Sequence, residues 1–143
     1  MSIRSRLSSS VAVLATSLAL AGCAPFSGFD DNNAIIEGNS FNSTMSSSMS
    51  TPSQFDFSCG TCNGVKRVRN ITVPENPVFS MTLTIGSGRF KAVLVRDNSV
   101  YTITDAPTQG MVRTSIPAGD YNLRIVAENA KFNLHLDLNT FGG

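Results

Sequence analysis

The feature that most constrains this chain is a strict alternation of apolar and polar side chains beyond residue 78. Phe79, Met81, Leu83 and Ile85 alternate with Ser80, Thr82 and Thr84, and the same pattern recurs in 121–125 and 132–138. A period of two puts the apolar members on one face of a strand. Strands with one apolar face belong to antiparallel sheets that bury that face and leave the other polar.

Turn signals divide the region after residue 64 into short pieces. Gly86-Ser87-Gly88 is read as a hairpin turn, and further Pro-, Gly- and Asn-containing clusters occupy 74–77, 97–99, 106–110 and 117–120. Strands at this spacing predict a sandwich or barrel. We therefore expect an all-β fold, a small antiparallel β-sandwich of about seven strands within 58–143. The expected strands are 65–73, 78–85, 89–95, 100–104, 111–116, 121–128 and 131–138.

The first 23 residues carry a different pattern. Arg4 and Arg6 precede an apolar run from 11 to 21, which is shorter than the roughly 20 residues that a spanning helix needs. The run ends in Leu20-Ala21-Gly22-Cys23. This arrangement resembles the signal of bacterial lipoproteins, with residues 1–22 as a cleaved signal peptide. The resemblance implies cleavage before Cys23 and acyl chains, such as palmitate, on that residue. The alternative is an ordinary secretory signal, with a plain thiol at Cys23.

The lipoprotein resemblance also implies a cellular location. The protein would be attached to a membrane of the cell envelope through lipid on Cys23, because two or three acyl chains hold a protein stably. Ala24 follows the cysteine, where an Asp often marks retention in the inner membrane, so the resemblance favours the outer membrane. The membrane face is left open.

Residues 23–57 read as the lipidated cysteine followed by a flexible tether. Ser and Asn dominate 24–57, apolar residues are scattered, and neither a period of 2 nor one of 3.6 is sustained. Such a segment is expected to bury too little apolar surface to offset its ordering entropy. Fully extended, about 34 residues would span roughly 110 Å. The sequence therefore predicts a folded domain that stands off from the membrane.

Charge limits the partners that this chain can have. The precursor has 11 Lys and Arg against 10 Asp and Glu, and two of the arginines lie in the predicted signal. The mature chain would be close to neutral, which argues against nucleic acid as a partner. Membrane attachment through Cys23 and an envelope protein or polysaccharide as the bound partner are the expectations that remain.

Cys59 and Cys62 form the sharpest candidate site. They are spaced Cys-Gly-Thr-Cys, and an even pair in an oxidising compartment is most simply a structural disulfide. The competing interpretation is thiol–disulfide exchange, for which neighbouring basic residues could lower a thiol pKa. That chemistry usually needs a helix after the pair, and no helical pattern follows. A zinc site would need two more ligands than the two thiolates provide.

Two further clusters of charged side chains are candidate sites. Lys66, Arg67 and Arg69 form a small basic patch that could meet an anionic surface, or could protect a strand edge from aggregation. His135 and Asp137 share a strand face and could form an acid–base couple, but surface alternation is the favoured explanation, because the sequence places no nucleophile or second carboxylate beside them. The absence of Trp lowers the expectation of a sugar-stacking surface.

The segment 116–125 followed by 132–136 resembles the closing strands of pre-peptidase C-terminal sandwich modules. Gly86-Ser87-Gly88 before 90–95 is similar to their middle hairpin. The resemblance covers about the last 65 residues and implies an accessory, targeting or binding domain. The sequence as a whole favours a non-enzymatic envelope lipoprotein that needs no cofactor and presents a binding or structural module. The alternatives are a redox protein that uses Cys59 and Cys62, and a polysaccharide-binding adaptor.

Overall fold

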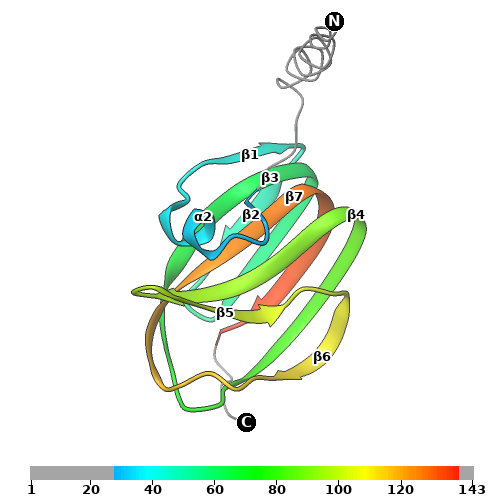
Figure 1. Cartoon of the computed structure of the whole chain (residues 1–143). Helices are drawn as coiled ribbons and strands as arrows, with labels where there is room; N and C mark the ends of the chain where they lie inside the picture. The colour runs from blue at the N-terminus through cyan, green and yellow to red at the C-terminus, as the bar shows by residue number, and fades with distance from the viewer. Residues whose placement is uncertain (1–27, 139–143) are drawn as a thin grey trace, which may run out of the picture.

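A computed structural model of the chain describes residues 28–138, and the predicted signal peptide and Cys23 lie outside this range. The all-β class and the antiparallel pairing are confirmed (Figure 1). The elements are α2 (Asn32–Glu37), β1 (Phe41–Thr44), β2 (Ser47–Ser50), β3 (Gln54–Val73), β4 (Val78–Arg96), β5 (Ser99–Thr104), β6 (Thr108–Arg113) and β7 (Gly119–Asp137).

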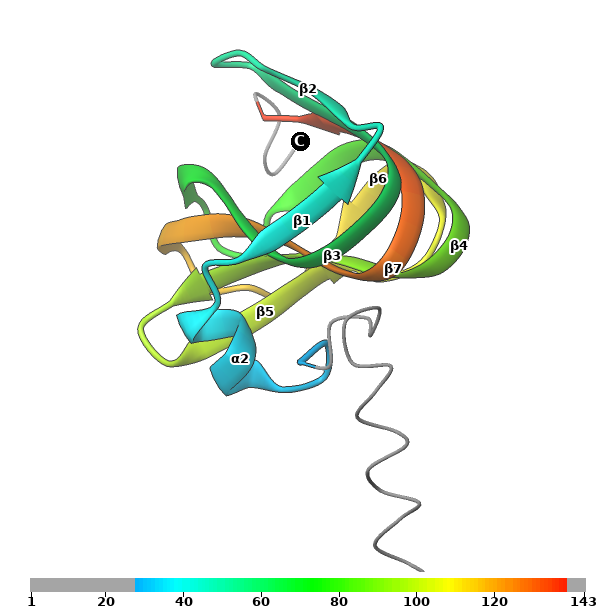
Figure 2. The same cartoon turned by 90° about the horizontal axis from the view of Figure 1, so that it is seen from above.

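The seven strands form one continuous sheet that closes over a core, in place of two separate sheets. Its order is β1-β3-β7-β4-β5, and β2 and β6 add to the outer edges of β3 and β4. The strands β3, β7 and β4 are 20, 19 and 19 residues long. Figure 2 shows these three strands curving round together, so that the sheet bends over itself. Each long strand therefore contributes to both halves of the fold.

The bend coincides with irregular pairing in all three long strands. Register shifts occur between Cys59 and Gly64 in β3 and between Ile85 and Arg89 in β4, both against the stretch of β7 around Asn129. Extra residues of this kind bend a strand and increase its twist. The expected turn at Gly86-Ser87-Gly88 is therefore wrong: β4 continues through these residues. Glycine occurs in bulges as well as in turns, because it adopts a positive φ without steric cost. Gly88 has such a conformation, with a φ of 73°.

The apolar faces predicted from the alternation lie inside the bent sheet. Phe79, Met81 and Leu83 are buried, and so are the matching positions of β7 before and after the bend. Phe132 packs against both Phe57 and Phe90, with ring centroids 5.5 and 4.3 Å apart. Because residues from both halves of each strand meet here, the bend itself creates the main core.

A second, smaller core lies on the outer face of the same sheet. Val65, Val93, Val95 and Val126 are buried there against Phe29 and Ile35. We call residues 28–40, which include α2, the strap, because they cross this face (Figure 2). The outer core stabilises the strap and shields valines that would otherwise be exposed to water.

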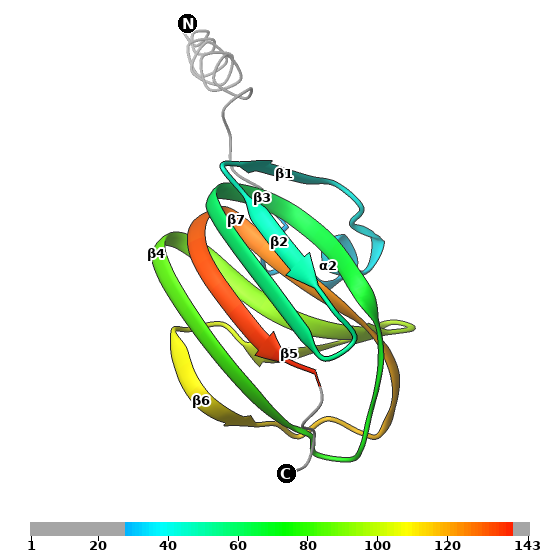
Figure 3. The same cartoon turned by 180° about the vertical axis from the view of Figure 1, so that it is seen from behind.

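The expectation of a flexible tether is wrong for residues 28–57. The strap, β1, β2 and the first residues of β3 fall within this stretch. Its few apolar side chains are placed to be buried: Phe29, Ile35, Phe55 and Phe57 are all at most 5% exposed. The polar strands β1 and β2 pair with β3 through their backbones, which needs no apolar face. Figure 3 shows β2 running beside β3.

No helix within residues 28–138 is both long and apolar enough to cross a bilayer.

Candidate functional site

Cys59 and Cys62 form a disulfide within the bulge of β3. Their Cα atoms are 6.2 Å apart, and the residues are 4% and 0% exposed. They face Phe132 and Ala130 of β7, so three steps along β3 oppose two steps along β7. The disulfide thus closes the bulge at the level where the sheet bends. No helix begins at the pair, which therefore lacks the helix N-terminus that lowers the pKa of a reactive thiol.

The three residues of the predicted basic patch make separate contacts. Arg67 Nε donates to the carbonyl oxygen of Gly38 at 3.1 Å, and Arg69 Nη2 donates to that of Thr51 at 2.7 Å. Lys66 Nζ lies 5.9 Å from the ring centroid of Phe41. The two arginines thus hold the strap and the turn after β2 against β3.

Arg124 is a buried charge that the alternation of the sequence does not predict. It was expected on the polar face of β7 and is only 7% exposed. Its Nη1 donates to the carbonyl oxygens of Ile35 and Ile36 at 2.7 and 2.6 Å, close to the end of α2. A cation at the C-terminal carbonyls of a helix is favourable. Burial lowers the pKa of Arg124, and the nearby charge of Arg67 lowers it further.

An ion pair holds the beginning of the strap. Arg89 donates to both carboxylate oxygens of Asp30, at 2.8 and 3.0 Å, and also contacts Glu128 at 3.3 Å. Its guanidinium carbon lies 4.1 Å from the ring centroid of Phe29. The hydrogen bond from Arg89 holds the pKa of the Asp30 carboxyl below its ordinary value. The chain is therefore fixed to the sheet at its first described residues.

His135 has a different partner from the one considered in the sequence analysis. Its Nδ1 lies 2.5 Å from Asp56 Oδ1, directly across the β3–β7 pair. Both side chains are more than a third exposed. This is a cross-strand pair of the kind that stabilises sheets. Among residues 28–138, no group of three or more His, Cys, Asp or Glu side chains is placed to hold a metal ion.

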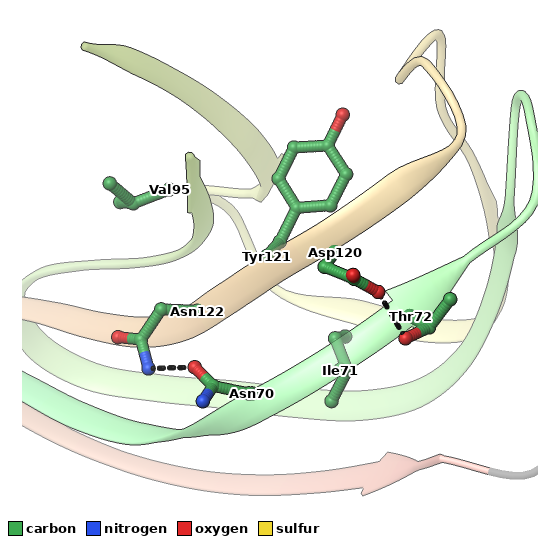
Figure 4. A pocket seen from close by; sticks show the side chains of 7 residues that line it. All are labelled: Asn70, Ile71, Thr72, Val95, Asp120, Tyr121 and Asn122. Atoms are coloured by element: carbon green, nitrogen blue, oxygen red, sulfur yellow. Dashed lines mark hydrogen bonds between the residues drawn. The ribbon is translucent and has the colours of Figure 1, made fainter. Parts of the chain in front are cut away.

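A polar groove of about 580 Å³ lies on the outer face beyond the strap. Asn122 Nδ2 donates to Asn70 Oδ1 at 3.0 Å, and Thr72 Oγ1 donates to Asp120 Oδ1 at 2.5 Å (Figure 4). Arg124 Nε donates to Asn122 Oδ1 at 2.8 Å, and this hydrogen bond fixes the orientation of the Asn122 amide. We call this surface the polar groove. Each amide keeps further donors or acceptors with which a ligand could form hydrogen bonds.

A second depression of about 420 Å³ lies where the strap begins. It is lined by Phe29, by Gly86 and Gly88 of the β4 bulge, and by Ala106 and Pro107 between β5 and β6. The start of the strap therefore adjoins the bend of the sheet.

Comparison with known proteins adds no relative. No family model, curated protein or solved structure matches this chain. The fold and geometry define a class only, an all-β domain built from one bent antiparallel sheet with an N-terminal strap.

Proposed function

We propose that this chain is a lipid-anchored protein of the cell envelope whose folded domain has a non-enzymatic binding or structural role. Cys23 carries the lipid, and the outer membrane is the favoured location because Ala24 follows it. The observation that carries the proposal is that Phe29 and Asp30, a few residues after the cysteine of the lipoprotein-like signal, already contact the sheet. A folded domain that lies this close in sequence to the predicted lipid is what a mature, anchored protein would present.

The disulfide supports an extracytoplasmic location. Disulfides persist in oxidising compartments and are rare where thiols are kept reduced. Cys59 and Cys62 are buried in a bulge of the sheet, an arrangement that favours a structural bond over an exchanging one. The same burial weighs against the redox alternative, because thiol–disulfide exchange needs access to sulfur.

Acylation can be tested directly in a bacterium that expresses the chain. We expect a fatty-acid analogue to label the wild type and the Cys59→Ala/Cys62→Ala double variant, and not Cys23→Ala. The intact mass of the labelled protein should correspond to a chain that begins at Cys23 and bears acyl groups. A wild-type chain that is exported without any acyl mass would contradict the proposal.

The polar groove is the surface on which we place the partner. Its paired amide, hydroxyl and carboxylate groups suit a ligand rich in hydrogen-bonding groups, such as an envelope polysaccharide or an extended segment of an envelope protein. Asn70→Ala/Asn122→Ala should weaken binding, and Asn133→Ala, on an exposed position of β7, is the matched control. Glycan arrays and cross-linking in intact cells would separate the two ligand classes.

A further inference from the structure

The strap gives the predicted anchor a fixed point of attachment on the domain. Phe29 lies between Arg89 and Lys91, whose charged ends are 4.1 and 4.7 Å from its ring centroid. Phe29 also lines one depression together with Gly86 and Ala106. We call residues 85–89, 105–107 and 128–131 the bend edge, because the sheet folds over at this level (Figure 1). The described chain therefore begins beside the bend edge.

The chain between Cys23 and this point is short. Five residue steps separate Cys23 from Gly28, which is a reach of about 18 Å at most. A domain of this length has a radius of gyration of about 13 Å, so its full breadth exceeds that reach. If Cys23 lies at the lipid headgroups, Gly28 stays close to them, and the far end of the domain does not reach them.

We infer that the bend edge faces the bilayer surface and that the opposite end of the sheet points away from it. This inference rests on the proposed lipid at Cys23. Along β7, nine residues separate Glu128 at the bend edge from Gly119, a distance of about 30 Å. Gly119 pairs with Val73, beside the loop 74–77 at the bottom of Figure 1. This loop and 114–118 form the far end.

Charge distinguishes this orientation from one in which the strap lies flat on the membrane. Residues 28–40 contain Asp30, Asp31 and Glu37, all exposed, and no Lys or Arg. An anionic bilayer would repel this acidic surface. The bend edge has Arg89 and Lys131 against Asp105 and Glu128, so its charges balance, and Lys91 lies next to it. The electrostatic repulsion from anionic headgroups is therefore weaker at the bend edge than at the outward side of the strap.

The orientation has a consequence for the polar groove. Asn122 lies six residues from Glu128 along β7, which is about 20 Å further from the bend edge. The polar groove would thus open away from the membrane that anchors the protein. The partner of this surface would be a molecule held beyond the headgroups, and not a lipid of the anchoring bilayer.

Paramagnetic broadening from the membrane tests the orientation. The acylated mature protein would be placed in nanodiscs of phosphatidylcholine and phosphatidylglycerol that contain a gadolinium-chelating lipid. We expect the amide signals of Ser87 and Ala106 to lose most of their intensity. Those of Glu75 and Asn76, in the far loop, should keep theirs, and the signal of Asn98, in the β4–β5 hairpin, should be affected little.

A matched control removes the short tether. A long Gly-Ser insertion after Ala24 leaves residues 28–138 intact and should make the broadening weak and uniform, while the amide spectrum of the fold stays unchanged. Equal broadening of Ser87, Asn98 and Glu75 in the uninserted protein would overturn the inference, and so would stronger broadening at Glu75. Persistence of the wild-type pattern after insertion would also overturn it, because the tether would then not set the orientation. A chain without acyl mass that does not join nanodiscs would instead refute the lipid anchor, and the inference with it.

Discussion

At the scale of single residues, a few long-range polar contacts decide how the N-terminal part folds. Arg124, Arg67 and Arg89 each reach from the sheet to the strap, across 29 to 89 residues of sequence. None of these contacts follows from local pattern. Arg124 looked like one more polar residue opposite Leu123 and Ile125, and only the strap above it makes the position buried.

Replacing Arg124 tests the link to α2. Arg124→Met would leave the carbonyl oxygen of Ile35 without this donor, and that of Ile36 with only the longer hydrogen bond from Arg67, at 3.4 Å. We expect a loss of about 2 kcal/mol in the free energy of unfolding, since hydrogen bonds to charged groups contribute about 1.5–3 kcal/mol. Urea denaturation measures it. Arg113→Met, at an exposed position, is the control and should change stability by less than about 0.5 kcal/mol. Equal stability of the two variants would contradict this role.

The Asp30–Arg89 pair predicts a pH effect with a definite sign. The pKa of Asp30 lies below its ordinary value of 3.8 in the folded state, first because of the hydrogen bond from Arg89. A carboxyl with a lowered pKa stabilises the fold above its unfolded value and loses this effect as the pH falls through the folded value. In Arg89→Gln, an NMR titration should show the Asp30 pKa shifted upward. An unchanged titration would show that Arg89 is not the cause.

The disulfide should stabilise the fold modestly. Its loop is very short, and the chain-entropy model gives about 2 kcal/mol for a closure of this size. Cys59→Ala/Cys62→Ala should lose about that amount of unfolding free energy. The wild type under reducing conditions should behave similarly, measured by denaturant unfolding with and without reductant. Catalysis of insulin reduction by the wild type, absent in the double variant, would instead favour the redox alternative.

At the scale of elements, the alternation predicted which residues form strands. It did not predict correctly where one strand ends and the next begins. The apolar positions of 79–83, 121–125 and 132–138 are buried as expected, and Ile85, beside the bulge, is partly buried. Gly86-Ser87-Gly88 was read as a turn because bulges and turns use the same residue types, and only pairing with β7 separates them. For the same reason the strands expected at 121–128 and 131–138 are one strand, β7.

The strap makes a stability prediction of its own. Ile35 of α2 is fully buried against the valines of the outer core, so Ile35→Ala should lose about 2–4 kcal/mol of unfolding free energy. Asn32→Ala, on an exposed position of the same helix, should change little. If both variants unfold at the same denaturant concentration as the wild type, the strap is not part of the folded domain.

At the scale of the whole molecule, class and strand direction were predictable, and the extent of the domain was not. The Ser- and Asn-rich stretch 39–53 has no apolar period, because β1 and β2 are edge strands held by backbone pairing to β3. Of the candidate sites, the Cys59–Cys62 disulfide was predicted, whereas the polar groove combines side chains that are 48 and 52 residues apart and has no local signal.

The central claim is that the strap, a few residues after the predicted lipid, is part of the folded domain. Amide hydrogen exchange of the mature protein tests it most directly, at Ile35, whose N–H donates to Asp31, and at Val65, whose N–H donates to Ser40. We predict that both amides exchange slowly, as the central sheet amide of Val126 does. Exchange of Ile35 and Val65 at the rate of an unstructured chain, with Val126 protected, would contradict the account.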